Sequence, residues 1–207
     1  MKSLLSKLVH TFTNFRSTAY HHYGDSYSSL FKMAYNSLFR LNEFILFERV
    51  LDDSVRPPTL NPDYVVTKPN SEELGEIRRN KELPREFFYD QFHGVRRCYV
   101  VLHNGQPAYI HWVYVKGEPN RFLKLEEGVG ELNYNTTLPE YRGQKLMGKM
   151  MVYIMNDLKE SGFSKAVGVV SATNPAALKS MAAAGFRQVR KFRTIGYFNR
   201  KYRVAKS

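Results

Sequence analysis

The sequence predicts an α+β domain with a central mixed, mostly antiparallel sheet and helices on both faces. Two runs rich in β-branched and aromatic residues, 97–102 and 107–115, flank Asn104-Gly105, a pattern typical of a β-hairpin. After a third, polar strand the pattern changes to a helix (142–159), a strand (165–170), a helix (174–184) and further strands. A meander that continues into β-α-β units gives a mixed sheet with helices packed on its faces.

The first 62 residues are predicted to form a helical and extended extension, and residues 63–207 the main domain. Residues 1–25 have apolar residues at helical spacing, and we expect this helix to pack on its own domain or on a partner subunit rather than on a membrane. A second apolar segment, 30–51, ends in Phe44-Ile45-Leu46-Phe47, which favours a strand. Prolines at positions 57, 58 and 62 indicate a connection, so we place the domain boundary there.

The main domain is expected to begin with a strand at Tyr64–Thr67. Asn70 then precedes Ser71-Glu72-Glu73, which is typical of a helix start with a capping residue and acids in the first turn. A short helix is expected around residues 84–91, before the hairpin.

Composition limits the classes of function. The chain has 207 residues, enough for one substantial domain, and a formal charge of +12. The single Cys98 excludes an intrachain disulfide, and the six histidines show no metal-ligand spacing, so we expect no metal. No apolar run is long enough to span a bilayer, and we expect a cytoplasmic protein. Residues 187–207 hold eight Lys/Arg and no Asp/Glu, so nucleic acid or an anionic membrane surface is a less favoured partner, beside an ordinary solvated basic face.

The stretch 131–149 carries the clearest functional signal. It reads as a polar strand, a turn at Pro139-Glu140, a basic loop from Arg142 to Lys145, and a long helix whose methionines are expected in the core. A loop that enters a helix presents unpaired backbone N–H groups and the positive end of the helix dipole. Such loops hold phosphates.

Two motifs in this region resemble those of the GNAT superfamily of acyl-CoA-dependent N-acyltransferases. Residues 137–148, TLPEYRGQKLMG, stand where the family has a strand, a hydrophobic-x-Pro segment and Arg/Gln-x-x-Gly-x-Gly/Ala at a helix start. Residues 174–186, NPAALKSMAAAGF, match in spacing a second signature, an Asn followed by a helix ending in Gly-Phe. The resemblance covers about residues 64–193 and implies the family's fold.

The resemblance implies that acetyl-CoA, or another short acyl-CoA, is the co-substrate. The implied contacts are the strand end, which pairs with the pantetheine arm, the loop that cradles the pyrophosphate, and the asparagine of the second signature: Thr136, Thr137, Leu138, Arg142, Gly143, Gln144, Lys145, Leu146, Met147, Gly148 and Asn174. The chain departs from the family pattern at Lys145 and Met147, which replace loop glycines. It departs again at Met181, which replaces a tyrosine that protonates the leaving thiolate in many members.

The attacking amine must lose a proton, and three residues are the candidates for the catalytic chemistry. Strict strand alternation would place Glu131, Asn133, Asn135 and Thr137 on one face. Glu131 is the first candidate base, and Asn133 is expected to orient a water molecule or the substrate. His111, on the neighbouring strand, is the second candidate base. The alternative is that this polar face is simply exposed to solvent.

These features predict an N-acyltransferase that moves an acetyl group to a primary amine by direct attack. Cys98 lies in a hairpin strand without a paired base, which disfavours a covalent intermediate. The charge suits an anionic small-molecule acceptor such as an amino sugar, and a homodimer is compatible with the sequence. The alternatives are a non-catalytic CoA-binding or interaction module, suggested by Met181 and the missing glycines, and an N-acetyltransferase directed at proteins or ribosomes through the basic C-terminal face.

Overall fold

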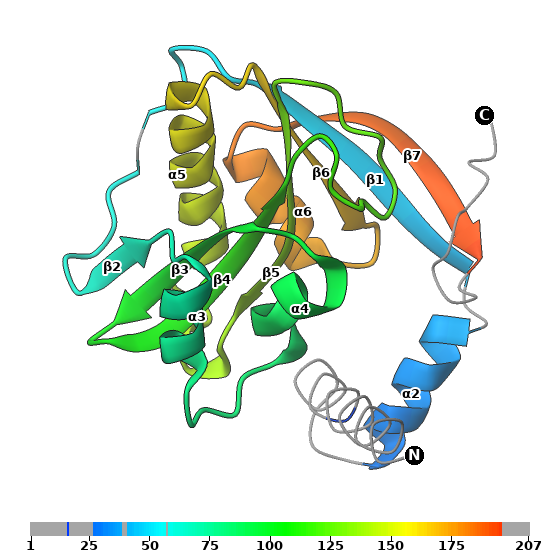
Figure 1. The fold of residues 1–207 in the computed structure, drawn as a ribbon. Coiled ribbons are helices and arrows are strands. Elements are labelled where there is room, and N and C mark those ends of the chain that lie inside the picture. The colour runs from blue at the N-terminus through cyan, green and yellow to red at the C-terminus, as the bar shows by residue number, and fades with distance from the viewer. Residues whose placement is uncertain (1–15, 17–26, 39–40, 57, 196–207) are drawn as a thin grey trace.

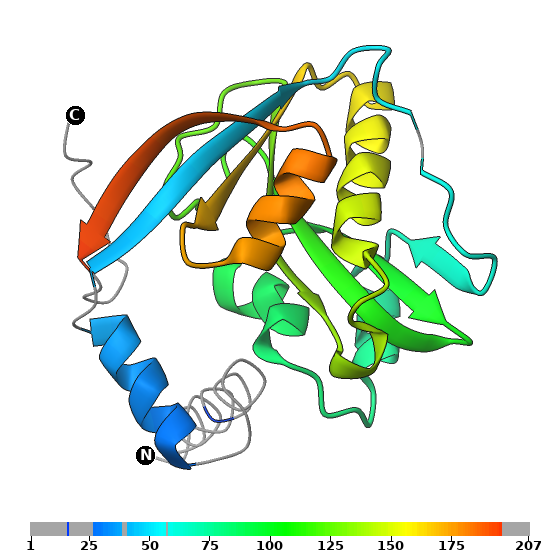
Figure 2. The same ribbon diagram turned by 180° about the vertical axis from the view of Figure 1, so that it is seen from behind.

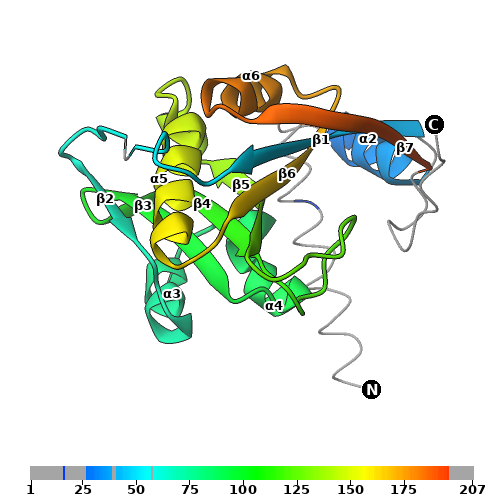
Figure 3. The same cartoon turned by 90° about the horizontal axis from the view of Figure 1, so that it is seen from above.

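The computed structural model of the chain describes residues 16, 27–38, 41–56 and 58–195. Within these residues, seven strands form one sheet in the order β2-β3-β4-β5-β6-β1-β7 (Figure 1). Neighbouring strands are antiparallel except β5 and β6, which are parallel. Helices α5 and α6 cover one face, and α3 and α4 cover the other (Figure 3). The predicted fold class is therefore confirmed.

The hairpin of β3 (Arg97–His103) and β4 (Gln106–Tyr114) is largely buried within the sheet. Asn104 and Gly105 have φ angles of 51° and 74°, as the left-handed turn between two twisted strands requires. Strand β2 (Tyr64–Thr67) pairs with β3 and forms one edge of the sheet. The strand and hairpin predictions are correct here because the turn residues and the strand residues favour the same structure.

On one face, α3 (Ser71–Arg78) is followed by the 3-10 helix η1 (Arg85–Phe88) and by α4 (Tyr89–His93). Asn70 accepts hydrogen bonds from the backbone of Glu72 and Glu73, and the Glu73 carboxylate bonds back to the Asn70 N–H, completing a capping box. The buried Arg78 guanidinium donates to both oxygens of Asp90, at 3.0 and 2.6 Å, and so ties α3 to α4.

On the other face, α5 (Leu146–Glu160) and α6 (Pro175–Ala183) lie side by side (Figure 2). The methionines Met150, Met151 and Met155 are buried against the sheet, as predicted for core residues. Helix α5 lies close to the sheet at Gly130, where a Cβ atom would come within 2.9 Å of Leu158 Cδ1.

The N-terminal segment corrects the predicted domain boundary. After α2 (Tyr27–Leu38), strand β1 (Leu41–Val50) lies between β6 (Lys165–Ser171) and β7 (Arg187–Ile195) and is antiparallel to both. The sheet thus extends to residue 41, and the proline-containing stretch 57–62 connects two strands of one sheet instead of two domains. The helix predicted for residues 1–25 and the basic residues after 195 lie outside the described residues.

Among the described helices, none is both long and apolar enough to cross a membrane.

Candidate functional site

Strand β5 (Val129–Thr137) contains a β-bulge at Tyr134. Trp112 pairs with Asn133, but the next residue of β4, His111, pairs with Asn135, so Tyr134 is an extra residue with φ of 48°. A bulge of this kind reverses the alternation of side chains beyond it.

The single polar face predicted for this strand is therefore wrong. Glu131 and Asn133 lie on the face of α3 and α4, opposite Tyr114 and Trp112, whose side chains belong to the core on that side. Asn135 and Thr137 lie on the α5 face, opposite His111 and Tyr109. The two predicted bases, Glu131 and His111, accordingly lie on opposite faces of the sheet.

Strands β5 and β6 separate just after Glu131. Their parallel pairing covers only Val129, Gly130 and Glu131, opposite Lys165 to Val167 (Figure 1). From residue 132 onward, β5 has β4 as its only partner among the described strands, while the rest of β6 pairs with β1. The backbone of β5 beyond the bulge is thus available to an extended ligand that pairs like an added strand.

The segment after β5 runs through the 3-10 helix η2 (Pro139–Tyr141) into a loop that ends at Lys145, and then into α5. We call this loop together with the first three residues of α5, residues 142–148, the α5 loop. Gly143 and Lys145 both have left-handed φ angles, 81° and 59°. No described residue accepts a hydrogen bond from the backbone N–H groups of residues 143–148. Because the positive end of the α5 dipole lies behind these groups, the loop fits a pyrophosphate.

Neighbouring side chains brace the α5 loop. The Tyr64 hydroxyl donates to Gln144 Oε1, and the Tyr64 ring lies 5.1 Å from His103, which in turn lies 5.5 Å from Tyr141. Arg142 Nε donates to the Thr137 carbonyl at 3.4 Å and joins the loop to the end of β5. The strand end and the loop, predicted as parts of one cofactor site, therefore lie together. Leu138 is buried, and its N–H donates to the Ala108 carbonyl at 3.0 Å.

The residues of the second signature lie on α6. Asn174 is the N-cap, and its side-chain oxygen accepts from the Ala177 N–H at 3.1 Å. Met181 is buried and lies against Gly168 of β6, where an added Cβ would be 2.7 Å from Met181 Cε. Met181 is thus a packing residue at the point where β6 leaves β5.

Glu131 is fully buried at the point where the strands part. Asn133 Nδ2 donates to Glu131 Oε1 at 2.9 Å, and the Asn120 side-chain amide donates to Oε2. Burial raises the pKa of the Glu131 carboxyl to about 8, and the hydrogen bond from Asn133 opposes this shift. A carboxyl group with such a pKa exchanges its proton near neutral pH, as a general base needs to.

His111 is also fully buried, but burial lowers its pKa to about 3. Its Nδ1 lies 2.7 Å from the Tyr109 hydroxyl, and its Nε2 has no hydrogen-bond partner among the described residues. A neutral imidazole that resists protonation is a poor acceptor for the proton of an ammonium group. Of the two candidates, Glu131 has the properties of a base.

Cys98 is buried, and burial raises the pKa of its thiol to about 12, so it is not an activated nucleophile. Within the described residues no group of three or more His, Cys, Asp or Glu side chains is arranged to hold a metal ion.

Sequence reasoning missed Asn120 and Tyr64. Asn120 lies in the loop between β4 and β5, where its side-chain oxygen accepts from the N–H groups of Phe122 and Leu123, both at 3.0 Å, while its amide holds Glu131. Nothing in the local sequence distinguishes it from an ordinary turn asparagine. Tyr64 appeared only as a strand residue, because its contact with Gln144 depends on the tertiary fold.

Comparison with known proteins agrees with this architecture. The family model described as acetyltransferase (GNAT) family matches residues 63–186. No curated protein matches the chain. One similar solved structure is a fungal multi-domain GH3 beta-N-acetylglucosaminidase that contains a GCN5-related glucosamine N-acetyltransferase region. It has 16% sequence identity and a TM-score of 0.58, and the match covers 82% of this chain and 23% of that chain.

Two bacterial structures are similar to the same extent. A GCN5-related N-acetyltransferase from Sphaerobacter thermophilus has 11% identity and a TM-score of 0.54 over 84% of this chain and 58% of that chain. A GCN5-related N-acetyltransferase-like protein from Streptococcus suis has 16% identity and a TM-score of 0.53 over 82% of this chain and 66% of that chain. The chain spans less than two thirds of the length of each of these three proteins.

At these identities the solved structures establish the fold alone. The family match covers more than half of the 207-residue chain and includes β2 to β6, the α5 loop and α6. On this match, the chain belongs to the acetyltransferase (GNAT) family.

Proposed function

We propose that this protein transfers an acetyl group, or another short acyl group, from acyl-CoA to a primary amine by direct attack. The observation that carries the proposal is the α5 loop, in which no described residue accepts from the N–H groups of residues 143–148, placed at the end of a strand that has separated from β6. The loop would hold the pyrophosphate, and the free side of β5 would pair with the pantetheine arm. Acetyl-CoA supplies an activated thioester.

Glu131 is the proposed general base, and Asn133 and Asn120 position its carboxyl group. An alkylammonium ion has a reference pKa of about 10, so the amine needs a base to remove its proton before it attacks. Glu131 is the last residue of β5 that pairs with β6, so its carboxyl group lies where the gap between the strands begins. The Asn120 side chain, from the loop between β4 and β5, donates a hydrogen bond to this carboxyl group.

The proposed reaction does not require a residue of α6 to protonate the thiolate of CoA as it leaves. Met181 is buried and carries no proton to donate. The reference pKa of a thiol, about 8.5, makes the thiolate a tolerable leaving group near neutral pH. The high pKa of Cys98 supports attack by the amine itself rather than by an enzyme thiol.

An anionic amino sugar is the proposed acceptor class. The formal charge of +12 favours anionic partners, and one structurally similar protein contains a glucosamine N-acetyltransferase region. Part of the basic C-terminal face is already neutralised within the fold. Arg187 pairs with Glu48, and Arg193 pairs with Glu43 at 3.1 Å. These pairs leave less charge on β7 for a protein or ribosome surface.

The test is calorimetric titration with acetyl-CoA, followed by an assay for free thiol with a panel of amines. We expect micromolar binding, and faster thiol release with glucosamine 6-phosphate than with glucosamine or a basic peptide. No binding at high micromolar acetyl-CoA would overturn the proposal. Binding without thiol release for any amine would leave a CoA-binding module, and release only with the peptide would favour a protein-directed enzyme.

A further inference from the structure

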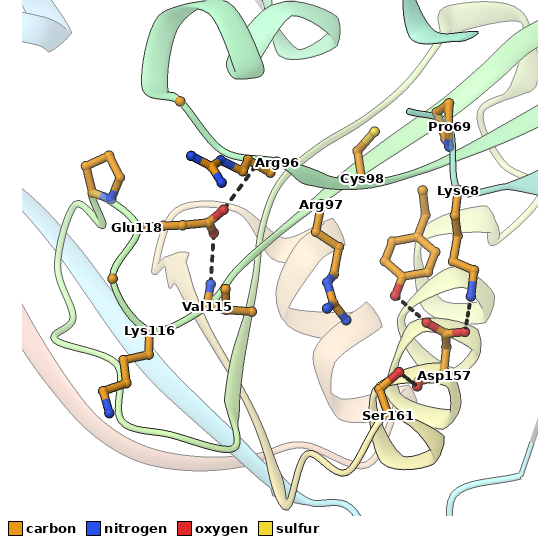
Figure 4. A pocket seen from close by; sticks show the side chains of 14 residues that line it. Lys68, Pro69, Arg96, Arg97, Cys98, Val115, Lys116, Glu118, Asp157 and Ser161 are labelled. Carbon is orange, nitrogen blue, oxygen red and sulfur yellow. Dashed lines mark hydrogen bonds and ion pairs between the residues drawn. The ribbon is translucent and has the colours of Figure 1, made fainter. Parts of the chain in front are cut away.

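The structure has a cavity that is separate from the α5 loop. Its volume is about 780 Å³, and it lies between the loop after β2, the start of β3, the loop after β4 and the last turns of α5 (Figure 4). The α5 loop is at the other end of that helix: Leu146 and Asp157 are eleven residues apart, about 16 Å at 1.5 Å per residue. No residue of the proposed acyl-transfer site lines this cavity.

Four cationic side chains and two carboxylates line the cavity: Lys68, Arg96, Arg97, Lys116, Glu118 and Asp157. Asp157 accepts from the Tyr99 hydroxyl at 2.7 Å and from Lys68 at 2.5 Å. Glu118 accepts from the backbone N–H groups of Arg96 and Val115, at 3.1 and 3.0 Å. Both carboxylates are thus engaged with donors in the wall, and the positive charge is in excess.

Arg97 is the cation best placed to bind a ligand. Among the described residues its guanidinium forms no ion pair, although it hydrogen-bonds to the Tyr99 side chain and acts electrostatically on the Asp157 carboxylate. The guanidinium lies 5.3 Å from the centre of the Phe163 ring, which holds it in place. Figure 4 shows Arg97 pointing into the space between Val115 and Asp157, and Lys116 pointing away from it. Lys116 forms an ion pair with Glu127 at 3.1 Å.

We propose that this cavity binds a small organic anion through its phosphate or carboxylate group, with Arg97 as the main contact. A planar guanidinium matches either group with two parallel hydrogen bonds. The volume lies within the range of small-molecule sites, and the charged walls suit a polar ligand rather than an apolar one. Arg96, whose backbone is fixed by Glu118, supplies a second positive charge at the rim.

The test is titration of the full chain with inorganic pyrophosphate and, separately, with citrate, at fixed ionic strength and with CoA present in excess to occupy the α5 loop. We expect at least one probe to bind at submillimolar concentration. Arg97→Gln should weaken that binding at least tenfold. A stronger response to pyrophosphate assigns the site to phosphate ligands, and a stronger response to citrate assigns it to carboxylates.

Arg190→Gln is the matched control, because Arg190 also lies over an aromatic ring, Phe192 at 5.8 Å, but on β7 outside the cavity. A larger loss of anion affinity in Arg97→Gln than in Arg190→Gln places the anion at the cavity, and this comparison does not depend on whether CoA binds. Both variants must keep the thermal unfolding midpoint of the wild type. The proposal is overturned if neither probe binds at 10 mM, or if the two variants lose affinity equally.

Discussion

The two halves of β5 on either side of Tyr134 differ in what surrounds them and in what they offer chemically. The half before the bulge is flanked by β4 and, through Glu131, by β6, and it buries a carboxyl group held by two asparagines. The half after the bulge pairs only with β4 among the described strands and leads into a loop of unpaired N–H groups. The closed half works through a side chain, and the open half works through the backbone.

This difference separates two tasks that one strand must perform. A buried side chain can have its pKa shifted, because removal from water raises the cost of its charge. A ligand can be held by backbone groups only where no neighbouring strand already uses them. The bulge reverses the side-chain alternation between the halves, so Glu131 faces α3 and α4 whereas Asn135 faces α5. The free backbone groups of the open half lie along the strand edge, between these two faces.

The largest expected effect comes from Glu131→Gln, which removes the proposed base from the closed half. We expect turnover to fall at least about 100-fold, since a positioned base typically contributes 10²–10⁴. In the wild type the rate should rise with pH through an apparent pKa near 8, and the variant should lose that rise. Steady-state rates from pH 6 to 10 check this. Glu127→Gln, an exposed carboxyl group near the start of the same strand, is the control and should keep the wild-type profile.

Gly143→Ala tests the open half. Gly143 has φ of 81° and nothing near its missing Cβ, so alanine brings backbone strain of about 1–2 kcal/mol without a clash. We expect the strain to move the N–H groups of the loop and to weaken acetyl-CoA binding about tenfold by calorimetry.

Gly162→Ala is the matched control for that substitution, because Gly162 follows α5 with φ of 84° and equally open space. It should lower the free energy of unfolding by a similar amount and leave acetyl-CoA affinity unchanged. Equal losses of acetyl-CoA affinity in both variants would show that backbone strain at either end of α5 weakens binding, and that the α5 loop has no special role.

The stability of the closed half should depend on pH. Because the pKa of Glu131 is raised from 4.5 to about 8 on folding, the contribution of this group to the free energy of unfolding is fully present below pH 4.5 and is lost as pH rises toward 8. The free energy of unfolding should fall by up to about 1.4 kcal/mol per pH unit in that interval from this group. The free energy of unfolding, measured by urea denaturation at several pH values, should depend less steeply on pH for Glu131→Gln than for the wild type. Parallel curves for the two proteins would mean that Glu131 titrates normally.

The smallest effect is expected for Lys145→Gly at the helix start. Lys145 has φ of 59°, which glycine adopts without strain, so the variant should be more stable by about 1 kcal/mol. Acetyl-CoA affinity should change only a few fold, because the backbone N–H groups stay in place. A loss as large as that of Gly143→Ala would show that the lysine charge, and not the backbone, holds the phosphates.

Sequence reasoning recovered what local chemistry determines. The Asn104-Gly105 turn and the Asn70 cap each have a short-range physical cause. The loop that enters α5 could be predicted for the same reason, because a turn, a glycine and a helix start follow one another in the sequence.

Features that depend on distant segments were not recovered. The bulge at Tyr134 breaks an alternation that the sequence alone supports, and no glycine marks it. The place of β1 is set by pairing with strands at the other end of the chain, and the cavity at Arg97 draws on separate segments. Side chains that meet only in the tertiary structure leave no local pattern to read.

The position of β1 also has a consequence for how the protein is made. During synthesis β1 emerges well before its two partner strands, because Val50 pairs with Lys165 and Leu41 with Ile195, so both edges of this strand stay unpaired until β6 and β7 have also emerged. Its apolar run Phe44-Ile45-Leu46-Phe47 is then an exposed segment prone to aggregation. Pairings over such long sequence distances also slow folding, because a large loop must close before they form. Recovery of soluble protein should therefore be limited by the time that β1 waits for its partners, more than by the stability of the finished sheet.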